Sequence, residues 1–159
     1  MDGMNFDNTI NDILSSYPTF NLSNNNIFEV MSGFDTSVPA KYLESTLVEA
    51  GLGMVVVHNK YDYCHGRTTL SHQNKGHTLI YLKSNNSGLD DLIIQETKTL
   101  YDNVILLESK FNDDLISNFD LLVQSMYLTK SIAEEQQKDL SRVEYAPAVK
   151  QLYYFKGKM

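Results

Sequence analysis

Residues 39–58 read PAKYLESTLVEAGLGMVVVH, a helical pattern that runs directly into a strand pattern. Pro39 suits the first turn of a helix. An apolar stripe continues from it at helical spacing through Leu43, Leu47 and Ala50. Gly51 can adopt the left-handed conformation in which many helices end. Residues 52–58 are rich in β-branched side chains, which favour strands. We therefore predict a helix over about 39–50 followed at once by a strand.

The sequence on either side predicts further strands and two more helices. A short amphipathic helix is expected near residues 4–16, and strands at 78–82 and 103–107, with a possible hairpin over 61–75. Acids favour helix amino termini, so Asp113 and Asp114 are expected to begin a long helix near 112–140. Its wide apolar face contains Leu115, Phe119, Leu122 and Met126. A last strand is possible at 152–155, after Pro147.

These elements predict an α+β fold, in which a small mixed or antiparallel sheet packs with two or three helices. The 159 residues are 42% hydrophobic and 21% charged, values typical of one globular domain spanning 1–159. No apolar run approaches the roughly 20 residues that cross a membrane. Cys64 is the only cysteine, which rules out an internal disulfide. A single cysteine also fits a reducing compartment, so we expect a cytoplasmic protein, either of a cell or of a virus-infected cell.

Charge is distributed unevenly along the chain. The formal net charge is −7. An acidic, Asn-rich amino-terminal region covers residues 1–38. Residues 89–140 hold eleven acids and four lysines, whereas the tail 141–159 is basic. An acidic surface repels phosphate, so the sequence argues against a protein that wraps nucleic acid.

One segment concentrates the side chains that could carry chemistry. All four histidines and the sole thiol fall within twenty residues: His58, Cys64, His65, His72 and His77. Zinc sites usually use closely spaced ligand pairs, and no such pair occurs here. A catalytic thiol needs a base within about 3 Å, which sequence adjacency does not secure. Polar residues of a hairpin or loop are the favoured interpretation, so we predict no catalytic residue, no metal and no cofactor.

A resemblance to a known family covers residues of about 28–155. Residues 28–38 (FEVMSGFDTSV) and 41–51 (KYLESTLVEAG), with the strand that follows, resemble the upper-collar proteins of small short-tailed phages, which are portals or head–tail connectors. Residues 102–107 (DNVILL) resemble the strand before that family's long helix. The chain is about half the family's length, which puts an unaided DNA channel in doubt.

The resemblance implies a non-enzymatic structural protein of a phage virion. Portals form homo-oligomeric rings, contact other virion proteins and let DNA pass during packaging, without sequence-specific binding, a membrane or a small-molecule substrate. On this interpretation the interaction residues are Asp113, Asp114, Asp120, Lys150, Lys156 and Lys158. An alternative is a small acidic virus-encoded inhibitor that binds a basic host partner. A third, less favoured interpretation is an enzyme centred on His58, Cys64, His65 and His77.

Overall fold

The computed structural model describes residues 6–15, 18–23, 25–73, 76–84, 88–142 and 147. Its centre is a four-stranded sheet in the order β2-β1-β3-β4. The strands are β1 (Ile27–Ser32), β2 (Met54–Asn59), β3 (His77–Lys83) and β4 (Asn103–Glu108). All three pairings between them are parallel. The protein is therefore an α/β fold, and the predicted mixed or antiparallel sheet is wrong.

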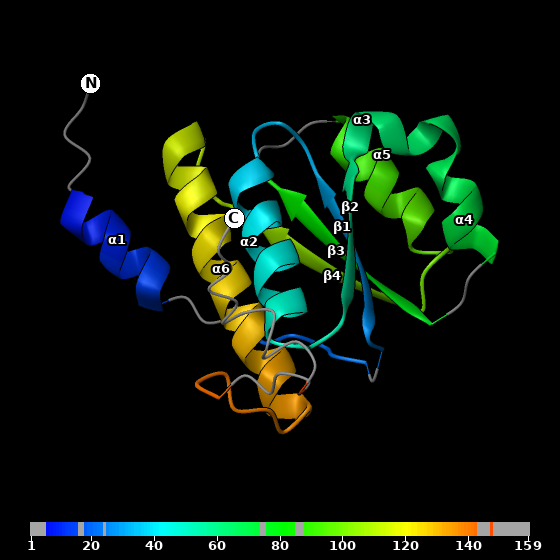
Figure 1. Cartoon of the computed structure of the whole chain (residues 1–159). Helices are drawn as coiled ribbons and strands as arrows, with labels where there is room; N and C mark the ends of the chain where they lie inside the picture. The colour runs from blue at the N-terminus through cyan, green and yellow to red at the C-terminus, as the bar shows by residue number, and fades with distance from the viewer. Residues whose placement is uncertain are drawn as a thin grey trace, which may run out of the picture.

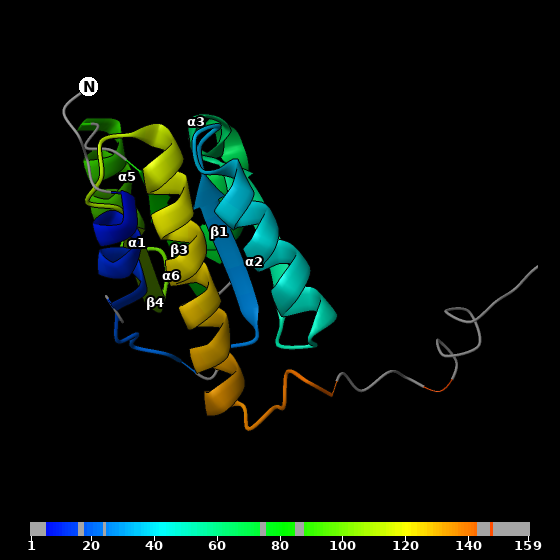
Figure 2. The same ribbon diagram turned by 90° about the vertical axis from the view of Figure 1, so that its left-hand side faces the viewer.

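Helices form a layer on each face of the sheet (Figure 1). One layer contains α2 (Ser37–Glu49) and α6 (Asp114–Glu135), with α1 (Phe6–Ser15) outside α6 (Figure 2). The other contains α5 (Gly88–Thr97) and three short turns, α3 (Lys60–Asp62), η1 (Tyr63–Arg67) and α4 (Thr68–Gln73). Parallel neighbours must be joined by such crossovers, because the chain has to return to the same end of the sheet.

Apolar side chains of the two central strands, β1 and β3, project from both faces of the sheet. Val30 and Ile80 pack toward α2 and α6, whereas Met31 and Leu79 pack toward α5. Strands buried on both faces read as continuous apolar runs, which is the pattern of a parallel sheet. Among the described residues, no helix is both long enough and apolar enough to cross a membrane.

The structure confirms the predicted helix and strand of residues 39–58, which are α2 and β2. It also confirms strands at 78–82 and 103–107, and the long helix, which ends earlier than predicted, at Glu135. The possible hairpin over 61–75 is wrong, because residues 60–73 form the short helical segments α3, η1 and α4 and not strands. The possible strand at 152–155 lies outside the described residues.

Candidate functional site

The carboxyl ends of β1 and β3 form the switch point of the sheet. From β1 the chain crosses through α2 to the β2 edge, whereas from β3 it crosses through α5 toward β4. In open α/β sheets, ligands bind where two neighbouring strands send their connections in opposite directions. We call the residues gathered there, Gly33, Asp35, Thr36, Lys60, Ser84 and Asp90, the switch-point site.

The turn from β1 into α2 leaves the start of that helix without a side-chain cap. The buried Thr36 hydroxyl accepts a hydrogen bond from Gly33 N at 2.8 Å, and Thr36 makes no capping bond to the helix. The first N–H groups of a helix have no partner within it, and the helix dipole places partial positive charge there. An uncapped amino terminus of this kind can receive an anion.

A second connection brings Ser84 to the same place. Ser84 follows β3 directly, and its hydroxyl donates to the Asp35 carboxylate. Its carbonyl oxygen accepts a hydrogen bond from the Ser117 hydroxyl of α6 at 3.1 Å. Asp35 and Ser84 therefore face each other across the switch point, although 49 residues separate them in the chain.

A buried ion pair completes the site. Lys60 follows β2, and its ammonium lies 3.0 Å from Asp90 in the first turn of α5. Both side chains are almost wholly buried, at 4% and 1% exposure. Asp90 also accepts a hydrogen bond from the Tyr81 hydroxyl at 2.7 Å. Burial, together with that bond and the Asp90 charge, raises the pKa of Tyr81, so the phenol stays protonated and acts as a donor.

A second cation near this edge of the sheet is already shared between two acids. Lys83, the last residue of β3, lies 2.9 Å from Asp91 and 2.8 Å from Glu108. The hydrogen bonds to Glu108 and Asp91 raise the pKa of Lys83. The ammonium of Lys83 is therefore held at the β4 side of the sheet, away from the Gly33 turn.

A separate polar cluster surrounds Glu29 on the α5 face of the sheet. The carboxylate lies 2.9 Å from His58 Nε2 and 2.6 Å from His77 Nδ1, and accepts hydrogen bonds from the hydroxyls of Ser71 and Tyr101. Burial would raise the pKa of Glu29, but these four hydrogen bonds outweigh it and lower the pKa to about 2. Glu29 is therefore a buried carboxylate that is held ionised.

The structure divides the histidine-rich segment singled out in the sequence. His58 and His77 meet at Glu29, whereas Cys64, His65 and His72 are exposed on the short turns. Within the described part of the chain, no three His, Cys, Asp or Glu residues are placed to hold a metal. Sequence reasoning missed Glu29; its only signal was a single acid in an otherwise apolar run, IFEVMS.

Three of the predicted interaction residues, Asp113, Asp114 and Asp120, belong to the amino-terminal half of α6 or its cap. Asp113 caps α6 by accepting from Ile116 N at 3.0 Å, and Asp114 lies in its first turn. Asp120 is buried and accepts a hydrogen bond from Gln124. The other three, Lys150, Lys156 and Lys158, lie outside the described residues.

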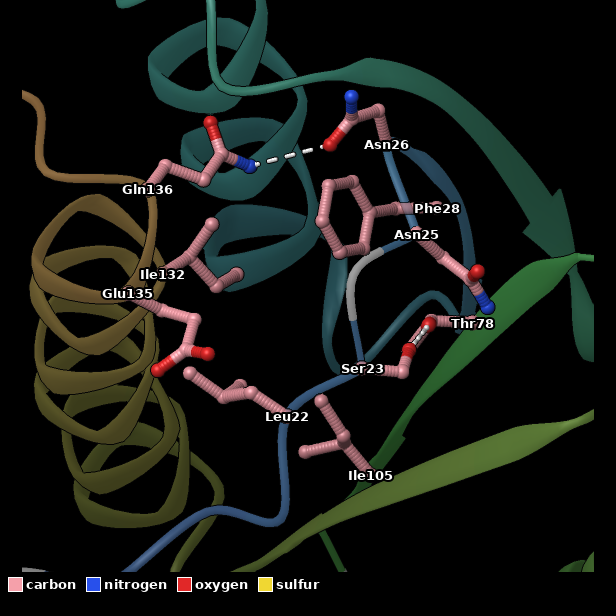
Figure 3. A pocket seen from close by; sticks show the side chains of 10 residues that line it. All are labelled: Leu22, Ser23, Asn25, Asn26, Phe28, Thr78, Ile105, Ile132, Glu135 and Gln136. Atoms are coloured by element: carbon pink, nitrogen blue, oxygen red, sulfur yellow. Dashed lines mark hydrogen bonds between the residues drawn. The ribbon is translucent and has the colours of Figure 1, made fainter.

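A small cavity of about 130 Å³ lies at the opposite edge of the sheet, beside the end of α6 (Figure 3). Leu22, Phe28, Ile105 and Ile132 form its apolar wall. Four of the polar residues that line it bond in pairs: Ser23 with Thr78 at 2.9 Å, and Gln136 with Asn26 at 3.3 Å. Asn25 and Glu135 also line it. The switch-point site brings more buried polar side chains together, so it is the stronger candidate.

Comparison with known proteins finds the fold but no close relative. No family model matches the sequence, and no curated protein matches it. A proposed phosphosugar isomerase from Clostridium difficile 630 superimposes with a TM-score of 0.69 over 91% of this chain, at 13% identity. One from Salmonella typhimurium LT2 does so with a TM-score of 0.64 over 77%, at 14% identity.

A glucosamine-6-phosphate deaminase from Thermotoga maritima is also similar, with a TM-score of 0.57 over 88% of this chain and 17% identity. The chain covers 42%, 41% and 44% of the Clostridium, Salmonella and Thermotoga proteins respectively, less than half of each. At these identities the likeness shows the fold, which is the parallel α/β fold shared by these sugar-phosphate enzymes.

This fold overturns the resemblance to phage portals. The similar solved structures are described as isomerases and a deaminase. The predicted virion ring, its DNA passage and its virion partners are therefore wrong, and the acidic-inhibitor alternative is not retained. Two predicted exclusions, of enzymatic activity and of a small-molecule substrate, are also wrong. The resemblance failed because a helix followed by a strand is a local pattern that unrelated folds share.

Proposed function

We propose that this chain binds a phosphorylated sugar at the switch-point site and forms part of an enzyme that isomerises it. The observation that carries the proposal is the meeting, at one switch point, of an uncapped helix start and the Ser84 hydroxyl. The fold, shared with phosphosugar isomerases and a sugar-phosphate deaminase, supports the same substrate class.

The site residues suit the two parts of such a substrate. The N–H groups that begin α2 can receive a phosphate. Hydroxyls such as Thr36 and Ser84 can orient oxygen atoms, since each can both donate and accept a hydrogen bond. Asp35 has no ion-pair partner among the described residues, whereas Asp90 is paired with Lys60. Asp35 is therefore our candidate for the general base that removes a proton from the sugar.

Binding of glucosamine 6-phosphate and fructose 6-phosphate, measured by calorimetry and by NMR shifts, tests the proposal. We expect both to bind more tightly than the corresponding unphosphorylated sugars, because the helix start attracts the phosphate. Shifts should concentrate in the Gly33 turn and at the start of α2. Equal affinity for phosphorylated and unphosphorylated sugars would contradict the proposal.

Thr36→Val should weaken binding of glucosamine 6-phosphate about tenfold. The variant removes the acceptor of the Gly33 N–H, so the turn that leads into α2 loses its hydrogen bond. A buried donor left without a partner costs about 1–3 kcal/mol, which we expect as lost stability in urea unfolding. Thr46→Val, on the same helix but near its other end, is the matched control and should leave the affinity unchanged.

Asp35→Asn should slow isomerisation by a factor of about 10² to 10⁴, the usual contribution of a general base. The amide is nearly the same size as the carboxylate but does not accept a proton at neutral pH. Exchange of the proton next to the sugar carbonyl with deuterated solvent, followed by NMR, measures this step directly. Unchanged exchange in Asp35→Asn, with substrate still bound, would remove Asp35 from the role of base.

A further inference from the structure

Lys60 reaches over the turn that we propose receives the phosphate. It is the first residue after β2, and its side chain extends across the adjacent strand β1. A Cβ atom placed on Gly33 would meet Asp35 Oδ1 first, and would lie 2.9 Å from Lys60 Cε and 3.3 Å from Nζ. Glycine at position 33 therefore leaves space that the Asp35 carboxylate and the Lys60 side chain share, and the ammonium lies beside the start of the β1–α2 turn.

The Lys60 ammonium has more hydrogen-bond donors than its ion pair with Asp90 needs. A lysine ammonium has three N–H donors. Among the described residues, Asp90 is the acceptor within hydrogen-bonding distance, through Oδ1 at 3.0 Å and Oδ2 at 3.3 Å. Asp90 is itself held by the Tyr81 hydroxyl. The carboxylate therefore fixes the position of Lys60 and, as far as the described residues go, leaves an N–H donor for a further acceptor.

The electrostatics of the site call for such a cation. The chain carries a net charge of −7, and Asp35 and Asp90 both lie at the switch point. Lys60 offsets Asp90, so Asp35 is the carboxylate left to face a phosphate, and the helix start supplies only about half a positive charge against it. Lys83 is already shared by Asp91 and Glu108. Lys60 is the cation that lies against the Gly33 turn.

We propose that Lys60 binds the phosphate of the sugar phosphate, and that Asp90 and Tyr81 are positioning residues that hold its ammonium over the Gly33 turn. This assignment rests on the proposed function of the site. On this assignment Lys60 recognises the negative charge of the phosphate, because an ammonium acts as a point charge and not as a planar fork. The phosphate-bearing end of the substrate is thereby placed at the β1 side of the switch point.

The test uses Lys60→Met together with the double variant K60M/D90N, which removes both charges and so avoids leaving a buried carboxylate alone. Lys83→Met is the matched control, a second buried lysine paired with carboxylates one strand away. Each protein is titrated with glucosamine 6-phosphate and with inorganic phosphate at two salt concentrations. We expect K60M/D90N to bind both at least tenfold more weakly than the wild type, and K83M to change the affinity less than threefold.

Salt dependence separates a phosphate ligand from a merely structural ion pair. Screening weakens attraction between charges, so the wild-type Kd should rise with salt more steeply than that of K60M/D90N. If K60M/D90N binds within threefold of the wild type with the same salt dependence, the Lys60 assignment is wrong while the proposed function stands. If the wild type binds neither compound, the proposed function fails and the Lys60 assignment fails with it.

Discussion

Glu29→Gln should destabilise the protein by about 3 kcal/mol at pH 7. The folded pKa of Glu29 is about 2, against 4.5 for a free glutamate, and each unit of difference corresponds to about 1.4 kcal/mol. The glutamine side chain keeps the size of the carboxylate but loses the charge to which His58, His77, Ser71 and Tyr101 bond. Urea unfolding followed by circular dichroism measures the loss.

The difference in unfolding free energy between the wild type and Glu29→Gln should depend on pH. Because folding lowers the pKa of Glu29, its contribution is complete above about pH 4.5 and is lost as the pH falls toward 2. The difference in unfolding free energy between the wild type and Glu29→Gln should therefore become smaller as the pH falls from 4.5 toward 2. Glu96→Gln, an exposed acid on α5, is the control and should stay near the wild type throughout. A gap that stays constant from pH 6 to pH 2.5 would contradict the ionised carboxylate.

Asp90→Asn should cost about 3–5 kcal/mol of stability. The substitution leaves the Lys60 ammonium buried, at 4% exposure, without its carboxylate. Removing one partner of a buried ion pair is strongly destabilising because the remaining charge is no longer compensated. Thermal and urea unfolding at neutral pH measure the effect. Glu44→Gln removes an acid from the exposed Lys41–Glu44 pair, and should cost less than about 1 kcal/mol.

A double-mutant cycle isolates the pair from its surroundings. K60M/D90N contains neither charge, so it should recover at least half of the stability lost in Asp90→Asn. Additive losses from the two single variants would instead show that Lys60 and Asp90 do not interact. The result also decides how far a fall in sugar-phosphate affinity can be assigned to the lost charge of Lys60 and not to a disturbed fold.

The Lys60–Asp90 pair and the Glu29 cluster lie in different places relative to the switch-point site. The Lys60–Asp90 pair lies at the carboxyl edge of the sheet, beside the Gly33 turn. The Glu29 cluster involves the third residue of β1 and joins β1 to β2, β3 and α4. His58 Nδ1 is buried there without a hydrogen-bond partner among the described residues. We therefore expect Glu29 variants to change stability more than sugar-phosphate affinity.

Local structure could be predicted because its causes are local. The apolar stripe of residues 39–50 and the β-branched run that follows correctly predicted α2 and β2. Asp113 and Asp114 correctly marked the start of α6, where the Asp113 side chain accepts from Ile116 N. These patterns depend on residues within about four positions of one another. β1 and α5 were not predicted; in β1 the acid Glu29 interrupts the apolar run IFEVMS.

Which strands pair, and therefore which side chains meet, was decided by the tertiary structure. The strand order places β1 between β2 and β3, so the segment predicted as a hairpin becomes a crossover of short helices. The same order brings Ser84 to Asp35, Asp90 to Lys60, and Tyr101 to Glu29 across 49, 30 and 72 residues. Such contacts depend on sheet topology and on the burial of both sheet faces. Neither is expressed in the local spacing of residues.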